Sequence, residues 1–342
     1  MLRFRRYITA ILMAGFLFIS AMPAKAETGR DYIKWVDFDV SYKALSQAMD
    51  YDIKTHESGI HLNWIEMLAF LGAKYGGNFS KYQEKDLNSL AKELKSGKNM
   101  QELTDGMKYY EYYHEAYSAV LSGFVGEYKT GSFGDNGEVL WENKYGLKAY
   151  HPIAAGFSSS AYDDFGAGRN YGFKRKHLGH DIFGAIGTPI VAVESGIVEV
   201  MGWNQYGGWR IGVRSFDGMR YYYYAHLRQN RPFHPDIQEG QIVKAGDVIG
   251  YMGHTGYSLK ENVNNIRETH LHIGLQLIFD PSQKEGNNEI WIDVYALMQL
   301  LQENKSEVYR VAETKEFYRK YNFDEPILHS GLKPLTGAGD KS

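Results

Sequence analysis

The segment from His270 to Leu277 alternates polar or small residues with leucine and isoleucine, and this period of two constrains the fold more than any other feature. Successive side chains of a β-strand point to opposite faces, so His270 and His272 would share one face, opposite an apolar face. A helix would instead place the two histidines on nearly opposite sides. We therefore expect a strand that buries one face in a core and carries two imidazoles on the other.

A third histidine ends the aromatic run from Tyr221 to Leu227, which reads Tyr-Tyr-Tyr-Tyr-Ala-His-Leu. The run is rich in residues that favour strands, and alternation would put Tyr222, Tyr224 and His226 on one face. Two predicted strands would then present three histidines over one groove.

His177 and Asp181 form the remaining pattern, His-Leu-Gly-His-Asp. A fully extended chain would separate residues four apart by roughly 13 Å, too far for both to reach one ion. The chain must curl between them, and Gly179 is the residue that we expect to permit it.

These residue types favour zinc chemistry. Two imidazoles and one carboxylate are usual ligands of a catalytic zinc, which keeps its fourth position open for water. The additional histidines would serve proton transfer and charge stabilisation. Because the chain contains no cysteine, thiolate metal sites and disulfides are excluded, and every ligand must be His, Asp or Glu. The set predicts a hydrolytic zinc enzyme.

The first residues have the form of an export signal. A basic stretch over residues 1–6 precedes an apolar run over 7–22 and the small-x-small site Ala24-Lys-Ala26. We expect cleavage after Ala26, which leaves a secreted or envelope protein with no stable membrane span. The formal net charge is only -3 and no basic stripe is visible, so nucleic acid is not expected as a partner.

The mature chain is predicted to have an α+β fold in three parts. Residues 27–130 form a helical N-terminal domain, because apolar residues recur at helical spacing in 62–71, 87–94 and 113–124, and Ser80-Lys-Tyr-Gln83 resembles a capping box. Residues 131–285 are rich in glycine and short strand-like runs, whose short connections favour an antiparallel sheet or sandwich. Residues 286–342 form a helical extension, with helices expected over 294–301 and 313–321. The expected strands are 188–193, 196–200, 209–213, 221–227, 247–250 and 270–278.

The ordered set of motifs resembles the lysostaphin-type zinc metallopeptidases, a family of peptidoglycan endopeptidases, over about residues 152–277. The motifs are His177-x-Gly-x-Asp181, Tyr224-Ala-His226-Leu, Gly246-Asp-Val-Ile-Gly250 with Gly253-His-Thr-Gly256, and His270-Leu-His272. Each is weak alone, whereas the ordered set is specific.

The resemblance implies a β catalytic domain of the lysostaphin-like (duplicated hybrid motif) type with one Zn²⁺ per chain. The metal ligands carried over are His177, Asp181 and His272. His270 and His226 match the family's other two histidines, one to take the proton of water and one to stabilise the oxyanion. The sequence does not decide which does which. The implied reaction is hydrolysis of peptide bonds in peptidoglycan stems or cross-bridges, and the glycines at 207, 208 and 212 would let an extended peptide approach the sheet.

Some features leave alternatives open. His180 stands where the family usually has an aliphatic residue, and it is either a rival ligand or a histidine that supports the site or lies at the surface. A non-catalytic relative that acts as an envelope scaffold or regulator would share the fold. Glu57-Ser58 resembles the start of a lysozyme-like transglycosylase site, without a further motif. The N-terminal helices would position the catalytic domain or bind the wall or an envelope protein.

Overall fold

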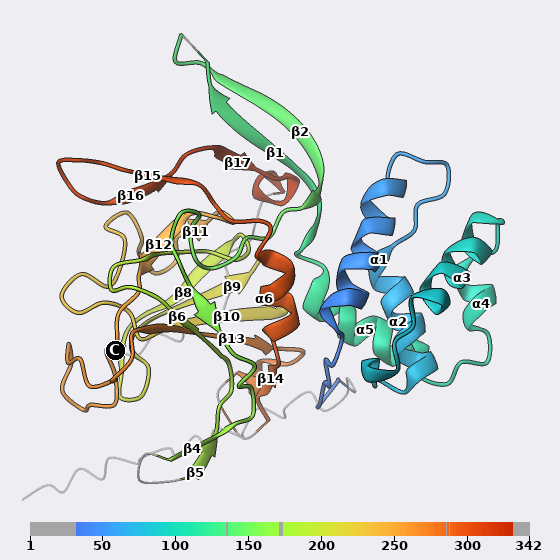
Figure 1. Cartoon of the computed structure of the whole chain (residues 1–342), viewed down its shortest axis with the longest axis horizontal. Helices are drawn as coiled ribbons and strands as arrows, with labels where there is room; N and C mark the ends of the chain where they lie inside the picture. The colour runs from blue at the N-terminus through green and yellow to red at the C-terminus, as the bar shows by residue number, and fades with distance from the viewer. Residues whose placement is uncertain (1–31, 135, 171–173, 285, 287, 331–342) are drawn as a thin grey trace, which may run out of the picture. The chain divides into compact units, whose positions relative to one another are not determined.

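The computed structural model describes residues 32–134, 136–170, 174–284, 286 and 288–330 (Figure 1). The predicted export signal and its cleavage site after Ala26 lie outside these residues. Across the described ranges, the helices are all too short or too polar to cross a membrane.

An antiparallel sheet of eight strands dominates the β-rich part, in the order β11-β8-β9-β10-β13-β6-β3, with β14 also paired to β13. This confirms the expected antiparallel architecture, and each of the strands expected from the sequence overlaps one in the structure. The bounds are β3 Ser160–Ala161, β6 His180–Phe183, β8 Gly196–Asn204, β9 Gly208–Ser215, β10 Arg220–Ala225, β11 Ile242–Val243, β13 His270–Leu277 and β14 Ile290–Ile292.

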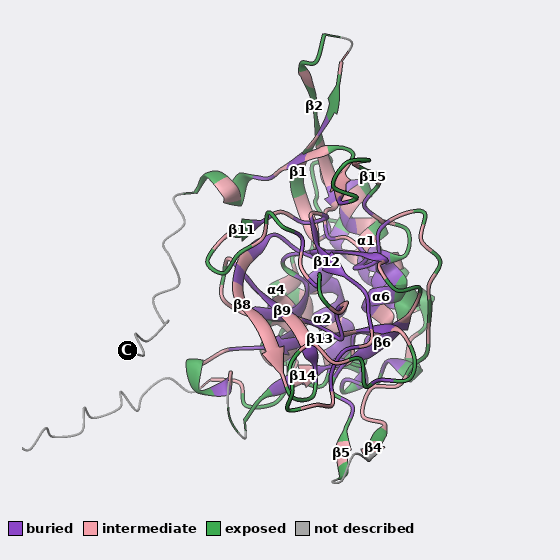
Figure 2. Cartoon of the chain, turned by 90° about the vertical axis from the view of Figure 1, so that its left-hand side faces the viewer, coloured by how far each residue is buried: buried purple, intermediate pink, exposed green. Residues whose placement is uncertain are grey.

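Strand β13 lies inside the sheet and carries the alternation seen in the sequence. Leu271, Ile273 and Leu275 are at most 1% exposed and belong to the hydrophobic core. Figure 2 shows β13 and β6 coloured as buried, in contrast to the exposed β4–β5 hairpin. His270 and His272 lie on the opposite face of β13.

Smaller sheets surround this one. Strands β1 and β2 form a long hairpin that pairs with β17, while β7 pairs with β12, β4 with β5 and β15 with β16. Their bounds are β1 Val125–Phe133, β2 Val139–Leu147, β4 Gly168–Asn170, β5 Lys174–Lys176, β7 Pro189–Val191, β12 Val248–Tyr251, β15 Val308–Arg310, β16 Phe317–Arg319 and β17 Asn322–Asp324.

Helices precede the sheet, as expected. Helix α2 ends at Gly76, which adopts the left-handed conformation (φ 65°) that favours glycine. The expected capping box at Ser80 is wrong: α3 begins at Glu84, and the Ser80 hydroxyl donates to Asn78 in a 3-10 turn. The helices are α1 Tyr42–Thr55, α2 Trp64–Tyr75, α3 Glu84–Lys95, α4 Met100–Thr104, α5 Tyr110–Leu121 and α6 Tyr295–Leu301, and the 3-10 turns are η1 Phe79–Lys81, η2 Pro281–Gln283 and η3 Pro326–His329.

The expected helical C-terminal extension is wrong beyond α6. Residues 313–321 contain β16, which pairs with β15 across a turn in which Lys315 has φ 64°. Tertiary contacts override the helical pattern here, because the buried Glu316 accepts hydrogen bonds from Tyr251 and Arg231. Phe317 packs against the cluster that contains Tyr251 and Val248.

The described residues from Ile33 to Ser330 form one compact unit, whose main hydrophobic cluster includes side chains of both the helices and the sheet. The domain boundaries expected at residues 130 and 285 stay predictions. Strand β1 already begins at Val125, within the region expected to be helical.

A buried arginine of the sheet forms hydrogen bonds with the C-terminal end of α5. Arg220, 2% exposed at the start of β10, donates two hydrogen bonds of 2.8 and 2.9 Å to the carboxylate of Glu194. It also donates to the carbonyl oxygen of Ala119 in α5 at 2.8 Å and to the Ser122 hydroxyl at 2.9 Å. A guanidinium at the C-terminal end of a helix also interacts favourably with the helix dipole.

Glu194→Gln should lower the free energy of unfolding by about 3 kcal/mol, because it leaves a buried guanidinium without its main counter-charge. Urea denaturation measures the effect. The matched control is Glu307→Gln, which breaks a half-exposed ion pair with Lys320 and should cost less than about 1 kcal/mol. Equal losses in the two variants would contradict this role of Arg220.

Candidate metal centre and active-site pocket

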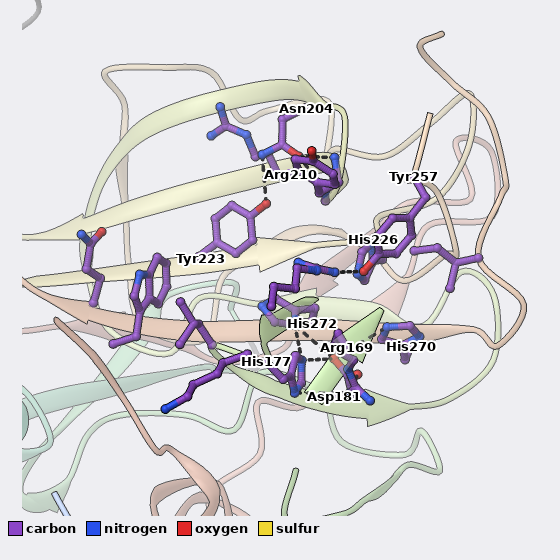
Figure 3. Close-up of a pocket in the computed structure, with 18 of the residues that line it drawn as sticks. Arg169, His177, Asp181, Asn204, Arg210, Tyr223, His226, Tyr257, His270 and His272 are labelled. Atoms are coloured by element: carbon purple, nitrogen blue, oxygen red, sulfur yellow. Dashed lines mark hydrogen bonds and ion pairs between the residues drawn. The ribbon is translucent and has the colours of Figure 1, made fainter. Parts of the chain in front are cut away.

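His177, Asp181 and His272 meet at one point, because β13 and β6 are neighbours and His272 lies directly opposite Asp181. The Nε2 atom of His177 is 2.8 Å from Nδ1 of His272, and each nitrogen is 3.1 Å from Oδ1 of Asp181. Figure 3 shows the three side chains converging. Among the described residues, this is the group of His, Cys, Asp and Glu that could hold a metal ion.

The donor set fits Zn²⁺. Zinc takes imidazole nitrogen and carboxylate oxygen in tetrahedral geometry at about 2.0–2.2 Å, which places ligand atoms about 3.3 Å apart. The three separations here are within about half an ångström of that value. Two nitrogens and one oxygen leave a fourth position, the arrangement typical of catalytic rather than structural zinc sites.

Two residues that the sequence analysis did not assign support this cluster. The carboxylate of Asp164 lies 3.1 Å from Nδ1 of His177, which orients the ring so that Nε2 faces the cluster. Arg169 donates to Oδ2 of Asp164 at 2.7 Å and to Oδ2 of Asp181 at 2.8 Å. No spacing rule links Asp164 to the ligands, so the sequence offered no signal for it.

Charge within the cluster shifts several pKa values. Burial would raise the pKa of Asp181, but hydrogen bonds from His177 and His272 outweigh it and hold that pKa far below its usual range. Burial would lower the pKa of His177, yet Asp164 and Asp181 raise it to about 9. Burial lowers the pKa of His272 despite Asp181. Metal binding must therefore displace a proton from His177.

His226 and His270 line the same pocket. Nδ1 of His226 donates to the carbonyl oxygen of Thr255 at 2.9 Å, and Nδ1 of His270 donates to that of Glu268 at 2.8 Å. These bonds leave the Nε2 atom of each ring for the pocket, and Nε2 of His270 lies 3.7 Å from Oδ1 of Asp181. The ring centroids are 4.8 Å apart, and burial lowers the pKa of His226 well below its usual value.

The expected face of the tyrosine run is wrong. Tyr222 donates to the buried Glu194 and Tyr224 accepts from the Val193 amide, so both point away from the pocket. Tyr221 and Tyr223 line the pocket with His226 instead. Alternation fails because β10 ends at Ala225, and His226 adopts a left-handed backbone with φ 61°.

The reason for the glycine between His177 and Asp181 also differs from the expectation. Gly179 has no left-handed backbone, so it is not needed for a sharp curl. A Cβ at this position would lie 2.6 Å from the His272 ring and 2.8 Å from the carbonyl oxygen of Ile273. Gly179 is therefore needed because the His272 imidazole packs directly against the backbone.

A cavity of about 730 Å³ opens over the cluster and the two further histidines. The glycines expected to admit a substrate backbone are already covered by this chain. The Tyr221 ring lies on Gly212, the Tyr223 hydroxyl on Gly207, and the backbone of Thr255 on Gly208. Tyr221 and Tyr223 line the pocket, as does Gly207.

His180 is not part of the cluster. It is 1% exposed on the opposite face of β6 from Asp181, with its ring against Tyr295 at a centroid distance of 5.3 Å. Its Nδ1 is 3.6 Å from Oδ1 of Asp164. It is therefore a buried neighbour of the residue that orients His177, and not a surface histidine.

Comparison with known proteins agrees with this geometry. A family model, Peptidase family M23, matches residues 175–285. The L-Ala--D-Glu endopeptidase of Bacillus subtilis is 41% identical over 111 residues, which are 32% of this chain and 32% of that protein. The glycyl-glycine endopeptidase ALE-1 of Staphylococcus capitis is 36% identical over 135 residues, 39% of this chain and 32% of that protein. The matched segment thus spans about a third of each relative.

A solved structure extends the likeness in fold. The crystal structure of a lytM protein from Ruminococcus gnavus superposes with a TM-score of 0.52 at 22% identity, over 80% of this chain and 91% of that one. Residues 175–285 belong to peptidase family M23, the lysostaphin type, and the resemblance expected from the motifs is confirmed.

Gly179→Ala should lower zinc affinity about 10–100-fold, the effect typical of disturbing a ligand's support, because the methyl group would displace the His272 ring. Equilibrium dialysis against zinc buffers measures the affinity. Gly168→Ala is the control, since a Cβ there meets no atom within 4 Å. Unchanged affinity in Gly179→Ala would show that the ring does not need this space.

Proposed function

We propose that this chain is an exported zinc endopeptidase that hydrolyses peptide bonds in peptidoglycan stems or cross-bridges. The observation that carries the proposal is the convergence of His177, Asp181 and His272 in one pocket with the imidazoles of His226 and His270. The M23 assignment supports the reaction class, and the matched relatives are endopeptidases by name.

The metal site would hold one Zn²⁺ through Nε2 of His177, Nδ1 of His272 and Oδ1 of Asp181. When bound, Zn²⁺ would supply Lewis-acid activation of water and of the scissile carbonyl. Asp164 and Arg169 would keep the ligands in place, since they hold His177 and Asp181 by hydrogen bonds.

The proton transfers would use the two remaining histidines. Nε2 of His226 or of His270 would accept the proton of the attacking water and pass it to the departing amine. The other imidazole would take a proton from solvent at Nε2 and donate it in a hydrogen bond to the oxyanion. The carbonyl oxygens of Thr255 and Glu268 hold both rings in the required orientation.

Location and partners follow as further parts of the proposal. The basic and apolar start of the chain would direct it through the membrane, with cleavage after Ala26. The helical N-terminal part would contact the wall or an envelope protein, and exposed aromatic side chains there, Trp35 and Tyr109, support this.

A non-catalytic envelope scaffold is the alternative function, and it is weakened because no member of the expected set is missing from the site.

His272→Ala should lose both zinc and activity, whereas His270→Ala should keep zinc and lose activity by about 10²–10⁴-fold. Zinc content by elemental analysis and release of peptide amines measure the two properties. His329→Ala, which removes an exposed histidine paired with Asp324, should change neither. Full activity in either of the first two variants would refute the assignment.

Digestion of purified peptidoglycan by the mature chain, followed by mass spectrometry, should reveal new amino and carboxyl ends in the peptides. A chelator should abolish them, because the reaction needs the metal. Cleaved glycan with intact peptides would instead favour the transglycosylase hypothesis at Glu57. No release by zinc-loaded protein would favour the scaffold.

A further inference from the structure

The pocket contains two arginines without carboxylate partners. Arg210 lies on β9 and Arg175 on β5, and both line the pocket. The Nε atoms of both are buried and have no hydrogen-bond partner within the described part of the chain. Three other cations of this pocket have carboxylate partners: Arg169 pairs with Asp164 and Asp181, Arg267 with Glu268, and Lys284 with Glu199.

Strand register places Arg210 close to the metal centre. Ile211 pairs with Tyr224, so Arg210 lies one residue further along, opposite Ala225, which itself pairs with His272. Neighbouring strands are about 4.8 Å apart, so the backbones of Arg210 and His272 are separated by about 10 Å. An extended peptide advances about 3.3 Å per residue, so Arg210 can contact a group within about three residues of the cleaved bond.

Tyr223 lines the pocket with both arginines, and its hydroxyl is hydrogen-bonded. Asn204 donates a hydrogen bond of 3.2 Å to this hydroxyl, and Figure 3 shows Asn204 and Arg210 on the same side of the pocket. Burial raises the pKa of Tyr223, while the charges of Arg210 and Arg175 oppose that shift. Arg175 itself is held over the rings of Tyr206 and Tyr257, at 5.7 and 5.3 Å from their centroids.

We propose that Arg210 and Arg175 bind a carboxylate of the substrate, so that this enzyme prefers peptides with a free carboxylate near the cleaved bond. The inference rests on the proposed endopeptidase function and specifies its substrate class. A guanidinium binds a carboxylate through two parallel hydrogen bonds, and both arginines line the pocket without a carboxylate partner in the described part of the chain. A glycine cross-bridge carries no side-chain carboxylate and would leave both arginines unpaired.

The first experiment compares synthetic stem peptides as substrates of the zinc-loaded chain. One peptide carries every carboxylate free, and in each of the others one carboxylate is amidated: that of the acidic residue, that of the diamino acid, or the terminal one. A pentaglycine peptide completes the set. One amidation should lower kcat/KM about 10–100-fold, as expected for loss of a charged hydrogen bond, and thereby identify the bound carboxylate.

Variants locate the binding group. Arg210→Gln should raise KM about 10–100-fold for the free-carboxylate peptide. For the peptide whose amidation already lowers kcat/KM, the same substitution should cause no further rise in KM. Arg210→Lys should recover part of the loss, because it keeps the charge without the two parallel donors. The matched control is Arg267→Gln, which removes an already paired cation from the same pocket and should change KM by less than about twofold.

The outcomes separate this inference from the proposed function. Equal cleavage of free and amidated peptides, or an equal loss on both in Arg210→Gln, overturns the carboxylate site and leaves the endopeptidase intact. If zinc-loaded protein cleaves no peptide, the proposed function fails, and calorimetry with the free-carboxylate peptide then tests the site alone. Binding at least tenfold weaker in Arg210→Gln supports the site, whereas equal binding overturns it.

Discussion

The candidate active site depends on the pairing of β13 with its two neighbours. On one side His272 lies opposite Asp181 of β6, and on the other it lies opposite Ala225 of β10. A shift of one residue would turn both histidines of β13 into the core and its leucines into the pocket. The buried apolar face of β13 prevents such a shift, so the same hydrophobic packing that stabilises the sheet also sets the geometry of the metal ligands.

Strand register brings the histidines together, and hydrogen bonds from neighbouring residues then orient their rings. Asp164 orients His177, while the carbonyl oxygens of Thr255 and Glu268 orient His226 and His270. Each of these three rings uses Nδ1 for support and leaves Nε2 for the pocket. In the proposed mechanism, these ring orientations would separate metal binding from proton transfer before any substrate arrives.

The remainder of the pocket has a different character from the metal centre. Aromatic rings line it, as Tyr221 does beside Gly212, and Arg175 and Arg210 lie in it without carboxylate partners in the described part of the chain. Such a surface suits an extended peptide with a negative group better than an uncharged one.

The helical part of the chain is tied to the sheet through Arg220, whose guanidinium reaches α5 from β10.

The sequence by itself determined the strand character of β13, the set of histidines around it and the family, because periodicity and ordered motifs are local properties. It failed at His226, whose left-handed backbone reverses the expected tyrosine face, and at residues 313–321, where burial of Glu316 overrides a helical pattern. Only the tertiary structure showed that Asp164 orients His177 and that Gly179 makes room for the His272 ring. Both depend on contacts between segments that are distant along the chain or folded back on themselves. Local pattern selects elements, whereas cross-strand register and packing decide which side chains meet.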